Sequence, residues 1–397
     1  MNMSRGHVMV LTGEPSGDVH GASLVRAMQR LDPALTFSGI GGAGMADAGV
    51  DLFFPIKDLS AMGLTEVVFQ FRSIKQAFDS FTSQLMAKRP GLLILIDYPG
   101  FNLKAARFAK KHTTTRVFYY ITPKIWAWNR SRIWQIKRFV DHAGLIFPFE
   151  EKLYKKAGIP ATYVGNPLMD HYPHAVTSKP RKTASPSDPW IIGLLPGSRK
   201  TEINNLLDLM VTAAKMVQKH RPDTRFLVSA ADAIPVERIE TALASQKETG
   251  LFRLVCGSPR QIFEQADMLI AASGTITLEA ALWKIPTLIV YKMSPVSFKI
   301  AQIVVKVKFA GLANLIAGRQ VMPELLQTQA SSQNICATAL DMLDNLPEYS
   351  RKLALVRQML GPAGAAARAA KIALDLLGRT NADDRTSLCL TNTSKPY

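Results

Sequence analysis

Short apolar runs, each followed by a turn and a helix-forming segment, occur in two successive sets along the chain. The first set comprises His7–Leu11, Leu35–Gly39, Leu92–Ile96, Arg116–Tyr120 and Gly144–Phe147. The second set comprises Trp190–Leu195, Arg225–Ser229, Phe252–Val255, Met268–Ala271 and Pro286–Tyr291. Strands that alternate with helices indicate parallel sheets with right-handed crossovers. We therefore expect an α/β protein with two doubly wound, Rossmann-like domains that face a central cleft, with ligands at the carboxyl ends of the strands.

The length of the chain and one proline-rich segment separate the two sets. A chain of 397 residues exceeds what one ordinary hydrophobic core accommodates. The segment Ser178–Pro189 is rich in proline, serine and lysine, which is typical of a linker. We predict domains over residues 1–177 and 178–345, C-terminal helices over 346–378, and a disordered polar tail over 379–397.

The formal net charge of +17 points to an anionic partner. The usual partners are nucleic acid, an anionic membrane surface or an anionic small substrate. The sequence lacks helix-turn-helix, RRM and KH signatures, so we expect no nucleic-acid partner. Three widely spaced cysteines indicate a reducing compartment, and we expect neither a signal peptide nor a bilayer-spanning segment.

Two basic stretches carry apolar residues at helical spacing, as expected for a face that docks on lipid headgroups. In residues 67–81 the apolar residues accompany Arg72 and Lys75, and they are Val67, Val68, Phe71, Ile74 and Phe78. In residues 293–320, Ile300, Ile303, Val304, Val307 and Phe309 lie among Lys299, Lys306, Lys308 and Arg319. The alternative interpretation is that each apolar stripe belongs to a buried core.

The segment Leu269–Leu282, LIAASGTITLEAAL, predicts a strand, a turn at Ser273-Gly274-Thr275 and a helix. The first N–H groups of a helix lack helical partners and carry a partial positive charge, so they bind phosphate. Glu279 lies one turn into the helix, where its carboxylate could accept both hydroxyls of a ribose. The alternative is an ordinary strand–helix unit capped by Thr275 or Thr277.

Two strand ends of the first set carry acids. Asp97 follows the apolar run LLILI and precedes Pro99. Partial desolvation there would raise its pKa towards the range of a general base, and the alternative is a turn-forming cap. The turn Gly13–Asp18 holds Glu14, Ser16 and Asp18 and matches neither a Walker loop nor a dinucleotide fingerprint.

The second set contributes a further anion site and no sign of a metal. The run Pro196–Lys200 supplies a glycine turn and the guanidinium of Arg199, which suit a diphosphate.

The chain contains no D-x-D, no H-E-x-x-H and no other metal-ligand spacing. A G-x-G-x-x-G occurs at Gly39–Gly44, but the segment after it is a poor helix to receive a pyrophosphate. We therefore expect neither a metal nor a cofactor.

Nine motifs together closely resemble the lipid-A-disaccharide synthase family. They run in order across most of the chain and comprise Gly13–Gly21, Gly39–Met45, Met62–Val67, Ile96–Asn102, Tyr119–Trp128, Leu195–Ile203, Ala272–Leu282, Tyr291–Pro295 and Asn314–Gln327. The resemblance implies a GT-B fold and an inverting transfer of 2,3-diacylglucosamine from its UDP derivative to 2,3-diacylglucosamine 1-phosphate, with release of UDP. It also implies a peripheral enzyme on the inner face of a Gram-negative inner membrane. Many members are homodimers through exchanged C-terminal segments, the alternative being that these helices pack back on the first domain.

The resemblance also assigns roles to individual residues. Asp97 corresponds to the general base for the acceptor 6-hydroxyl, Glu14 belongs to the acceptor side, and Ser16 and Asp18 shape its loop. On the donor side, Arg199 and the turn Ser273, Gly274 and Thr275 would hold the diphosphate. Glu279 would bind the ribose, and Asn314 would make a further contact with the donor.

The chain departs from the family pattern at two positions. Gly100 stands where the family commonly has an acid, and Asn166 replaces a usual histidine, so any role of those side chains is in doubt. Three other functions remain open from the sequence: another GT-B enzyme such as a UDP-sugar 2-epimerase, an NAD oxidoreductase, and a non-catalytic basic adaptor at a membrane surface.

Overall fold

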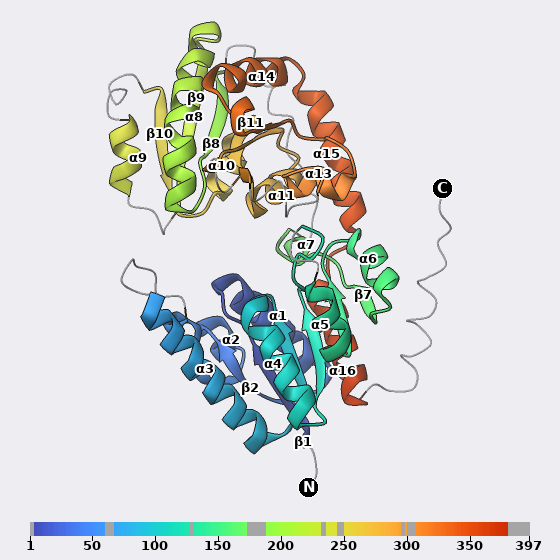
Figure 1. The fold of residues 1–397 in the computed structure, drawn as a ribbon. Coiled ribbons are helices and arrows are strands. Elements are labelled where there is room, and N and C mark those ends of the chain that lie inside the picture. Colours follow the sequence, from blue (N-terminus) through green and yellow to red (C-terminus); the bar gives the residue numbers. More distant parts are fainter. Residues whose placement is uncertain are drawn as a thin grey trace. The chain divides into compact units, whose positions relative to one another are not determined.

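The computed structural model describes residues 4–59, 67–127, 131–172, 188–231, 236–243, 250–294, 298–299 and 307–379. The chain divides into two compact units, which are drawn in Figure 1. Unit 1 comprises Met1–His171 and Pro362–Tyr397, and unit 2 comprises Tyr172–Gly361.

Unit 1 is built on a seven-stranded sheet in the order β3-β2-β1-β4-β5-β6-β7. All neighbouring strands are parallel, and their bounds are β1 Ser4–Leu11, β2 Thr36–Gly41, β3 Val50–Pro55, β4 Pro90–Ile96, β5 Arg116–Tyr120, β6 His142–Leu145 and β7 Ala161–Tyr163. Every residue of β4 is buried, as expected for a central parallel strand covered on both faces.

Helices cover both faces of this sheet. They are α1 Pro15–Leu31, α2 Ala43–Asp47, α3 Val67–Lys88, α4 Pro99–His112, α5 Arg132–Phe139, α6 Glu150–Ala157, α7 Leu168–His171 and α16 Ala365–Leu377, with a 3₁₀ turn at Ile56–Asp58. Side chains alternate along β1: Val8 and Val10 join one core, whereas Met9 and Leu11 join the core on the opposite face. The period of two explains why one apolar strand serves both cores.

Helix α16 comes from the C-terminal end of the chain but packs against α1 in unit 1, as the red helix among the blue and teal elements of Figure 1. The carboxylate of Asp170 accepts hydrogen bonds from the N–H groups of Gly364, Ala365 and Ala366 at the start of this helix. Arg368 donates to the carbonyl oxygens of Val164, Ala363 and Pro362. These contacts bind the C-terminal helix to β7 and α7.

Unit 2 is built on a six-stranded parallel sheet in the order β10-β9-β8-β11-β12-β13. Its strands are β8 Trp190–Leu195, β9 Thr224–Ala230, β10 Phe252–Cys256, β11 Met268–Ala272, β12 Thr287–Tyr291 and β13 Glu324–Leu326. Its helices are α8 Lys200–His220, α9 Val236–Leu243, α10 Arg260–Gln265, α11 Thr275–Leu282, α13 Leu312–Ala317, α14 Ser332–Asp344 and α15 Leu346–Leu360, with a 3₁₀ turn at Gln327–Gln329. The predicted α/β class with two doubly wound parallel sheets is confirmed.

The C-terminal segment predicted over 346–378 is shared between the units, since α15 packs on α11 and α13 whereas α16 packs in unit 1. The domain boundaries drawn from the sequence stay predictions. Among the helices that the structure describes, none is long and apolar enough to cross a membrane.

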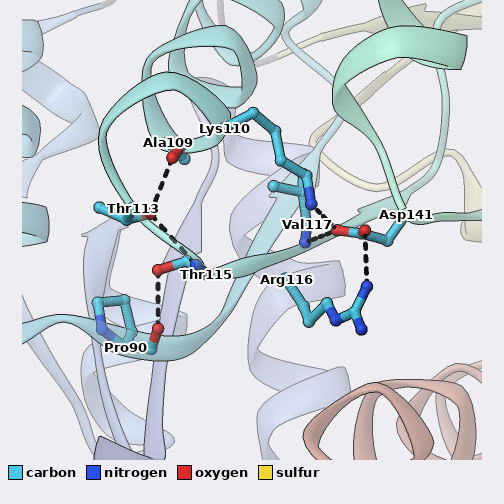
Figure 2. A network of polar contacts seen from close by, with 8 residues as sticks. All are labelled: Pro90, Ala109, Lys110, Thr113, Thr115, Arg116, Val117 and Asp141. Carbon is cyan, nitrogen blue, oxygen red and sulfur yellow. Dashed lines mark hydrogen bonds and ion pairs between the residues drawn. The ribbon is translucent and has the colours of Figure 1, made fainter. Parts of the chain in front are cut away.

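The amino-terminal edge of the unit 1 sheet is closed by a polar network, shown in Figure 2. The carboxylate of Asp141 accepts hydrogen bonds from the ammonium of Lys110, the guanidinium of Arg116 at 3.2 Å and the N–H of Val117 at 2.6 Å. The hydroxyl of Thr115 donates to the carbonyl of Pro90 at 2.8 Å. The network joins α4, β4, β5 and the start of β6 at the edge opposite to the predicted ligand sites.

Candidate functional site

Asp97 lies in a sharp turn that connects β4 to α4. Asp97 and Tyr98 have φ angles of +46° and +43°, in the left-handed region that residues with a side chain seldom occupy. A strand that turns abruptly into a helix through such residues projects the first side chain from the carboxyl edge of the sheet. The neighbouring strand β5 ends similarly, because Ile121 has a φ of +58°. Backbone strain of this kind gathers at functional sites.

Hydrogen bonds from neighbouring elements hold this turn in place. The Nδ2 of Asn102 donates to the carbonyl oxygens of Ile96 at 3.1 Å and Asp97 at 2.7 Å. The buried hydroxyl of Tyr119 donates to the same Asp97 carbonyl at 2.8 Å. The N–H of Asp97 donates to the carbonyl of Ile121 at 3.2 Å. The main chain of Asp97 is therefore fixed on both sides, while its side chain is only half-buried.

Burial raises the pKa of the Asp97 carboxyl above its ordinary value, and the positive charge of Lys124 opposes this shift. Lys124 is exposed and lies in the segment after β5. A half-buried carboxylate with a raised pKa has the character of a general base, since it holds a proton more readily than a solvated aspartate.

The turn after β1 lies against the Asp97 turn. A Cβ atom on Gly13 would lie 2.2 Å from the ring of Tyr98, so only glycine permits this approach. Glu14 follows as the exposed N-cap residue of α1, and burial together with the charge of Glu14 raises the pKa of Tyr98. Glu14 and Asp97 therefore belong to adjacent turns at the same edge of the sheet.

Asp18 binds the glycine loop after β2. Its carboxylate accepts hydrogen bonds from the N–H groups of Gly42 at 2.7 Å, Gly44 at 2.9 Å and Met45 at 3.0 Å. The side chain is 7% exposed. Asp18 thus shapes this edge through the loop, whereas Ser16 is exposed in the first turn of α1.

In unit 2, the turn Ser273-Gly274-Thr275 lies between β11 and α11, as the sequence predicted. The N-cap residue is Gly274, which has no side chain to accept from the helix, and the Thr277 hydroxyl donates to the Gly274 carbonyl at 2.8 Å instead. The interpretation in which Thr275 or Thr277 caps this helix is therefore not supported. Gly274 and Thr275 are exposed.

Two neighbouring helix starts of unit 2 are occupied by carboxylates of the chain itself. Glu202 accepts from the N–H groups of Ser198 at 2.9 Å and Arg199 at 3.3 Å at the start of α8. Glu324 accepts from the N–H groups of Ala310 at 2.8 Å and Gly311 at 2.9 Å at the start of α13. The N-cap of α11 has no side-chain cap. Among these three, α11 is the helix start best suited to an external anion.

Arg199 carries its guanidinium at the surface beside α8. Its Nη1 lies 3.6 Å from Oε1 of Glu202, and 79% of the side chain is exposed. An exposed ion pair of this kind contributes little to stability. A phosphate could therefore bind this guanidinium with little loss of stability from the broken pair.

Asn314 supports the Ser273-Gly274-Thr275 turn through buried contacts. It is fully buried; its amide nitrogen donates to the carbonyl of Met322 and to Glu324, and its oxygen accepts from the N–H groups of Val321 and Met322. Glu324 in turn binds the N–H of Ala310, whose carbonyl accepts the hydroxyl of Ser273 at 3.0 Å. These contacts use the hydrogen-bonding capacity of the Asn314 amide, so the geometry gives it a positioning role.

Glu279 lies on α11 with its carboxylate 3.2 Å from the hydroxyl of Tyr172, which donates to Oε2. The ring of Tyr172 packs edge-on against Trp283, with 5.9 Å between centroids. The sequence did not single out Tyr172, because it lies more than a hundred residues from Glu279.

A further residue that the sequence did not single out is the acid Glu150, at the start of α6. It is 1% exposed and accepts hydrogen bonds from Nε1 of Trp126 at 2.9 Å and from the N–H of Phe147 at 3.1 Å. Burial raises the pKa of Glu150 to about 7. No local sequence signal reveals this burial: Phe147 is only three residues away, but Trp126 lies 24 residues away in another segment.

The residues expected at a membrane have different surroundings in the structure. Ile74 and Phe78 are partly buried and pack against the core of unit 1, where Phe78 contacts the rings of Phe81, Phe101 and Phe108. Their place at a membrane stays a prediction. Lys308 is exposed, with its ammonium 5.4 Å from the ring centroid of Phe309. The side chains of Val67, Val68 and Phe71, and the whole of Lys306, lie outside the described residues.

The two departures from the family pattern have different surroundings. A Cβ atom on Gly100 would meet nothing within 4 Å, so there is space for the acid that this chain lacks. Asn166 is buried, donates to the carbonyl of Ile146 and accepts from the N–H of Leu168. Across the described ranges, no three His, Cys, Asp or Glu side chains gather in a way that could hold a metal ion.

Solved structures with a similar architecture identify the fold. The UDP-GlcNAc 2-epimerase of Neisseria meningitidis bound to UDP-GlcNAc aligns with a TM-score of 0.62 at 13% identity, covering 94% of this chain and 100% of that one. The MurG protein of Acinetobacter baumannii aligns with a TM-score of 0.58 at 15% identity, covering 94% and 99%. These likenesses confirm the predicted GT-B fold.

Sequence relationships are much closer. The chain is 38% identical over 379 residues to the lipid-A-disaccharide synthase of Geobacter sulfurreducens, with 94% of this chain and 97% of the relative covered. Residues 8–367 match the family described as LpxB, lipid-A-disaccharide synthetase. This chain therefore belongs to the lipid-A-disaccharide synthetase family.

Proposed function

We propose that the enzyme joins UDP-2,3-diacylglucosamine to 2,3-diacylglucosamine 1-phosphate. The acceptor 6-oxygen forms a bond to C1 of the donor sugar, the bond from C1 to the diphosphate oxygen breaks with inversion, and UDP leaves. The products are the lipid A disaccharide 1-phosphate and UDP. Membership of the family supports the reaction class, and the Asp97 turn is the single structural observation that carries the mechanism.

Asp97 acts as the base in this reaction. Its carboxylate takes the proton of the acceptor 6-hydroxyl as the new bond forms, which increases the nucleophilicity of the oxygen. The raised pKa favours this role, because a carboxylate of ordinary acidity is a weak proton acceptor at neutral pH. Glu14 contacts the acceptor from the adjacent turn, while Ser16 and Asp18 shape this side of the site.

The donor nucleotide binds to unit 2. The N–H groups at Ser273-Gly274-Thr275 and the guanidinium of Arg199 hold the diphosphate, and Glu279 accepts hydrogen bonds from the ribose hydroxyls. No metal takes part in this proposal, since helix-end amides and a guanidinium neutralise the charge of the leaving group. Asn314 contributes by holding the carboxylate of Glu324, which binds the backbone that precedes α13.

A peripheral position on the inner face of the inner membrane follows from the proposed substrates, because both carry acyl chains. Withdrawing an acyl chain from a bilayer costs about 0.8 kcal/mol for each methylene group. In the described part of the chain, α5 offers a suitable surface: Trp134 is 71% exposed and lies beside the exposed cations Lys137 and Arg138. The ammonium of Lys137 approaches Gly158 at the end of α6, which adds exposed Lys155 and Lys156.

We further propose a homodimer, with an exchanged C-terminal segment as one arrangement. Light scattering across a range of protein concentrations measures the mass of the particle in solution. A monomer mass at every concentration would reject the homodimer.

Release of UDP from UDP-2,3-diacylglucosamine, with and without the lipid acceptor, tests the proposed reaction. We expect release to require the acceptor and to fall at least a hundredfold in Asp97→Asn. A UDP-sugar 2-epimerase would transform a UDP-sugar alone, and a non-catalytic adaptor would bind lipid without releasing UDP. Full activity of Asp97→Asn would refute the role of Asp97 as the base.

A further inference from the structure

We propose that Tyr172 is a positioning residue of the nucleotide site, which orients the carboxylate of Glu279 for the ribose hydroxyls. The proposal rests on the role of Glu279 proposed above. Tyr172 lies outside the nine motifs that carry the family resemblance.

Three contacts fix Tyr172 from different sides. Its hydroxyl donates to Oε2 of Glu279 at 3.2 Å. Its ring lies edge-on to Trp283 at an interplanar angle of 77°. Its carbonyl accepts a hydrogen bond of 2.9 Å from Nη2 of Arg357 on α15. A tyrosine held by its main chain, ring and hydroxyl has few rotamers left, so its hydroxyl has a defined position.

The spacing of the partners on α11 explains how one tyrosine reaches both. Glu279 and Trp283 are four residues apart, and the N–H of Trp283 donates to the carbonyl of Glu279 at 3.0 Å. Residues at this spacing share one face of a helix. Trp283 is 7% exposed and also contacts the ring of Phe263, so it offers a rigid platform for the tyrosine ring.

A carboxylate that binds two adjacent ribose hydroxyls must present both oxygens in one orientation. Each carboxylate oxygen has two lone pairs, so Oε2 can accept from Tyr172 and from a ribose hydroxyl together. Burial, followed by the negative charge of Glu279, raises the pKa of Tyr172, so the phenol stays protonated and remains a donor. Tyr172 therefore reduces the conformational entropy that the Glu279 side chain loses when the nucleotide binds.

The substitution Tyr172→Phe removes the hydroxyl and leaves the ring on Trp283. We expect the dissociation constant of UDP, measured by calorimetry on the full chain, to rise about three- to tenfold, as for the loss of one hydrogen bond. The dissociation constant of 2′,3′-dideoxy-UDP should stay unchanged, because that ligand lacks the hydroxyls that Glu279 receives. Tyr349→Phe, a partly buried tyrosine on α15 of the same unit, is the matched control and should alter neither value.

A second background separates this proposal from the assignment of Glu279. In Glu279→Ala, UDP binding should weaken, and adding Tyr172→Phe should cause no further loss. Unchanged UDP affinity in Tyr172→Phe, or an equal loss for UDP and the dideoxy nucleotide, would overturn the role of Tyr172 alone. Unchanged UDP affinity in Glu279→Ala would instead overturn the ribose site itself, and with it the proposal.

Discussion

The amide nitrogen of Asn102 donates a hydrogen bond of 2.7 Å to the carbonyl oxygen of Asp97. Asn102 lies in the first turn of α4, and its side chain is fully buried. The contact holds the backbone of Asp97 in the left-handed conformation that turns β4 into α4. The position of the proposed base therefore depends on a neighbour that does not touch the substrate.

Asp97→Asn should reduce turnover by about two to four orders of magnitude, since an amide cannot accept the proton of the acceptor hydroxyl. The affinity for UDP should stay unchanged because the proposed nucleotide site lies in unit 2. Steady-state rates and calorimetry measure the two quantities. Asp141→Asn is the matched control: it breaks the network of Figure 2 at the opposite edge of the sheet, so it should lower the melting temperature while turnover at low temperature is retained.

Replacing Lys124 by glutamine should shift the acid limb of the pH–rate profile to higher pH. The charge of Lys124 lowers the pKa of Asp97 against the effect of burial, so its removal raises that pKa further. A base works only when deprotonated, so a higher pKa means that activity is lost at a higher pH as the solution is acidified. The measurement is kcat/KM against pH; an acid limb that stays in place or moves to lower pH contradicts the pairing of Lys124 with Asp97.

Glu279→Ala should weaken UDP binding about tenfold to a hundredfold, because hydrogen bonds to a charged carboxylate contribute about 1.5–3 kcal/mol each. Glu264 on α10 serves as a control acid in the same unit, since it is half-exposed and pairs with Arg260 at 2.9 Å. Glu264→Ala should bind UDP normally. If both variants bind like the wild type, another residue receives the ribose.

Lys137→Gln combined with Arg138→Gln should lower binding to vesicles that contain phosphatidylglycerol about thirtyfold, at about 1 kcal/mol for each basic residue near the surface. Trp134→Ala should lower it further, because an exposed tryptophan inserts at the headgroup level. Vesicle sedimentation measures both. Lys215→Gln with Lys219→Gln on α8 removes the same charge from unit 2 and should bind normally; equal losses in the two pairs would indicate only a general effect of net charge.

The buried acid Glu150 should make the folded state less stable as the pH rises from about 4.5 to about 7. Its folded pKa of about 7 exceeds the ordinary value of 4.5, so in this window the folded state holds more protons than the unfolded state. The expected contribution is about 3 kcal/mol. Urea unfolding of Glu150→Gln between pH 5 and 8 should lack this loss.

Comparison with the wild type isolates that effect, because His20 acts in the opposite direction. Burial lowers the pKa of His20 to about 4, so its contribution to stability increases as the pH rises from about 4 towards 6.5. His20 is present in both proteins and cancels in the difference. If the difference in free energy of unfolding between the wild type and Glu150→Gln does not change with pH, Glu150 is ionised in the folded state.

The predicted strands correspond to strands of the structure, but three further strands were missed: β3, β7 and β13. All three lie at the edges of their sheets, and most of their residues are only partly buried. A central parallel strand needs apolar side chains on both faces and therefore has a continuous apolar run. An edge strand does not need one, so its sequence can resemble a loop, although the edge strand β10 was predicted.

The fold class and the positions of Asp97 at a strand end and Glu279 on a helix follow from local sequence patterns. A strand end is visible as the last apolar residue before a turn, and side chains at such ends gather at one edge of a parallel sheet. The net charge of +17 likewise indicates an anionic partner. These are local or additive properties of the chain, so they can be read without coordinates.

Which of those side chains bind other parts of the protein depends on contacts between distant segments. The folded structure shows that Asp18 and Asn314 bind backbone groups, that Ile74 and Phe78 pack against the core, and that Tyr172 reaches Glu279. Burial and hydrogen bonding depend on residues far apart in the sequence. The raised pKa of Asp97, expected from its place after a buried apolar strand, is caused by burial among the elements packed around it.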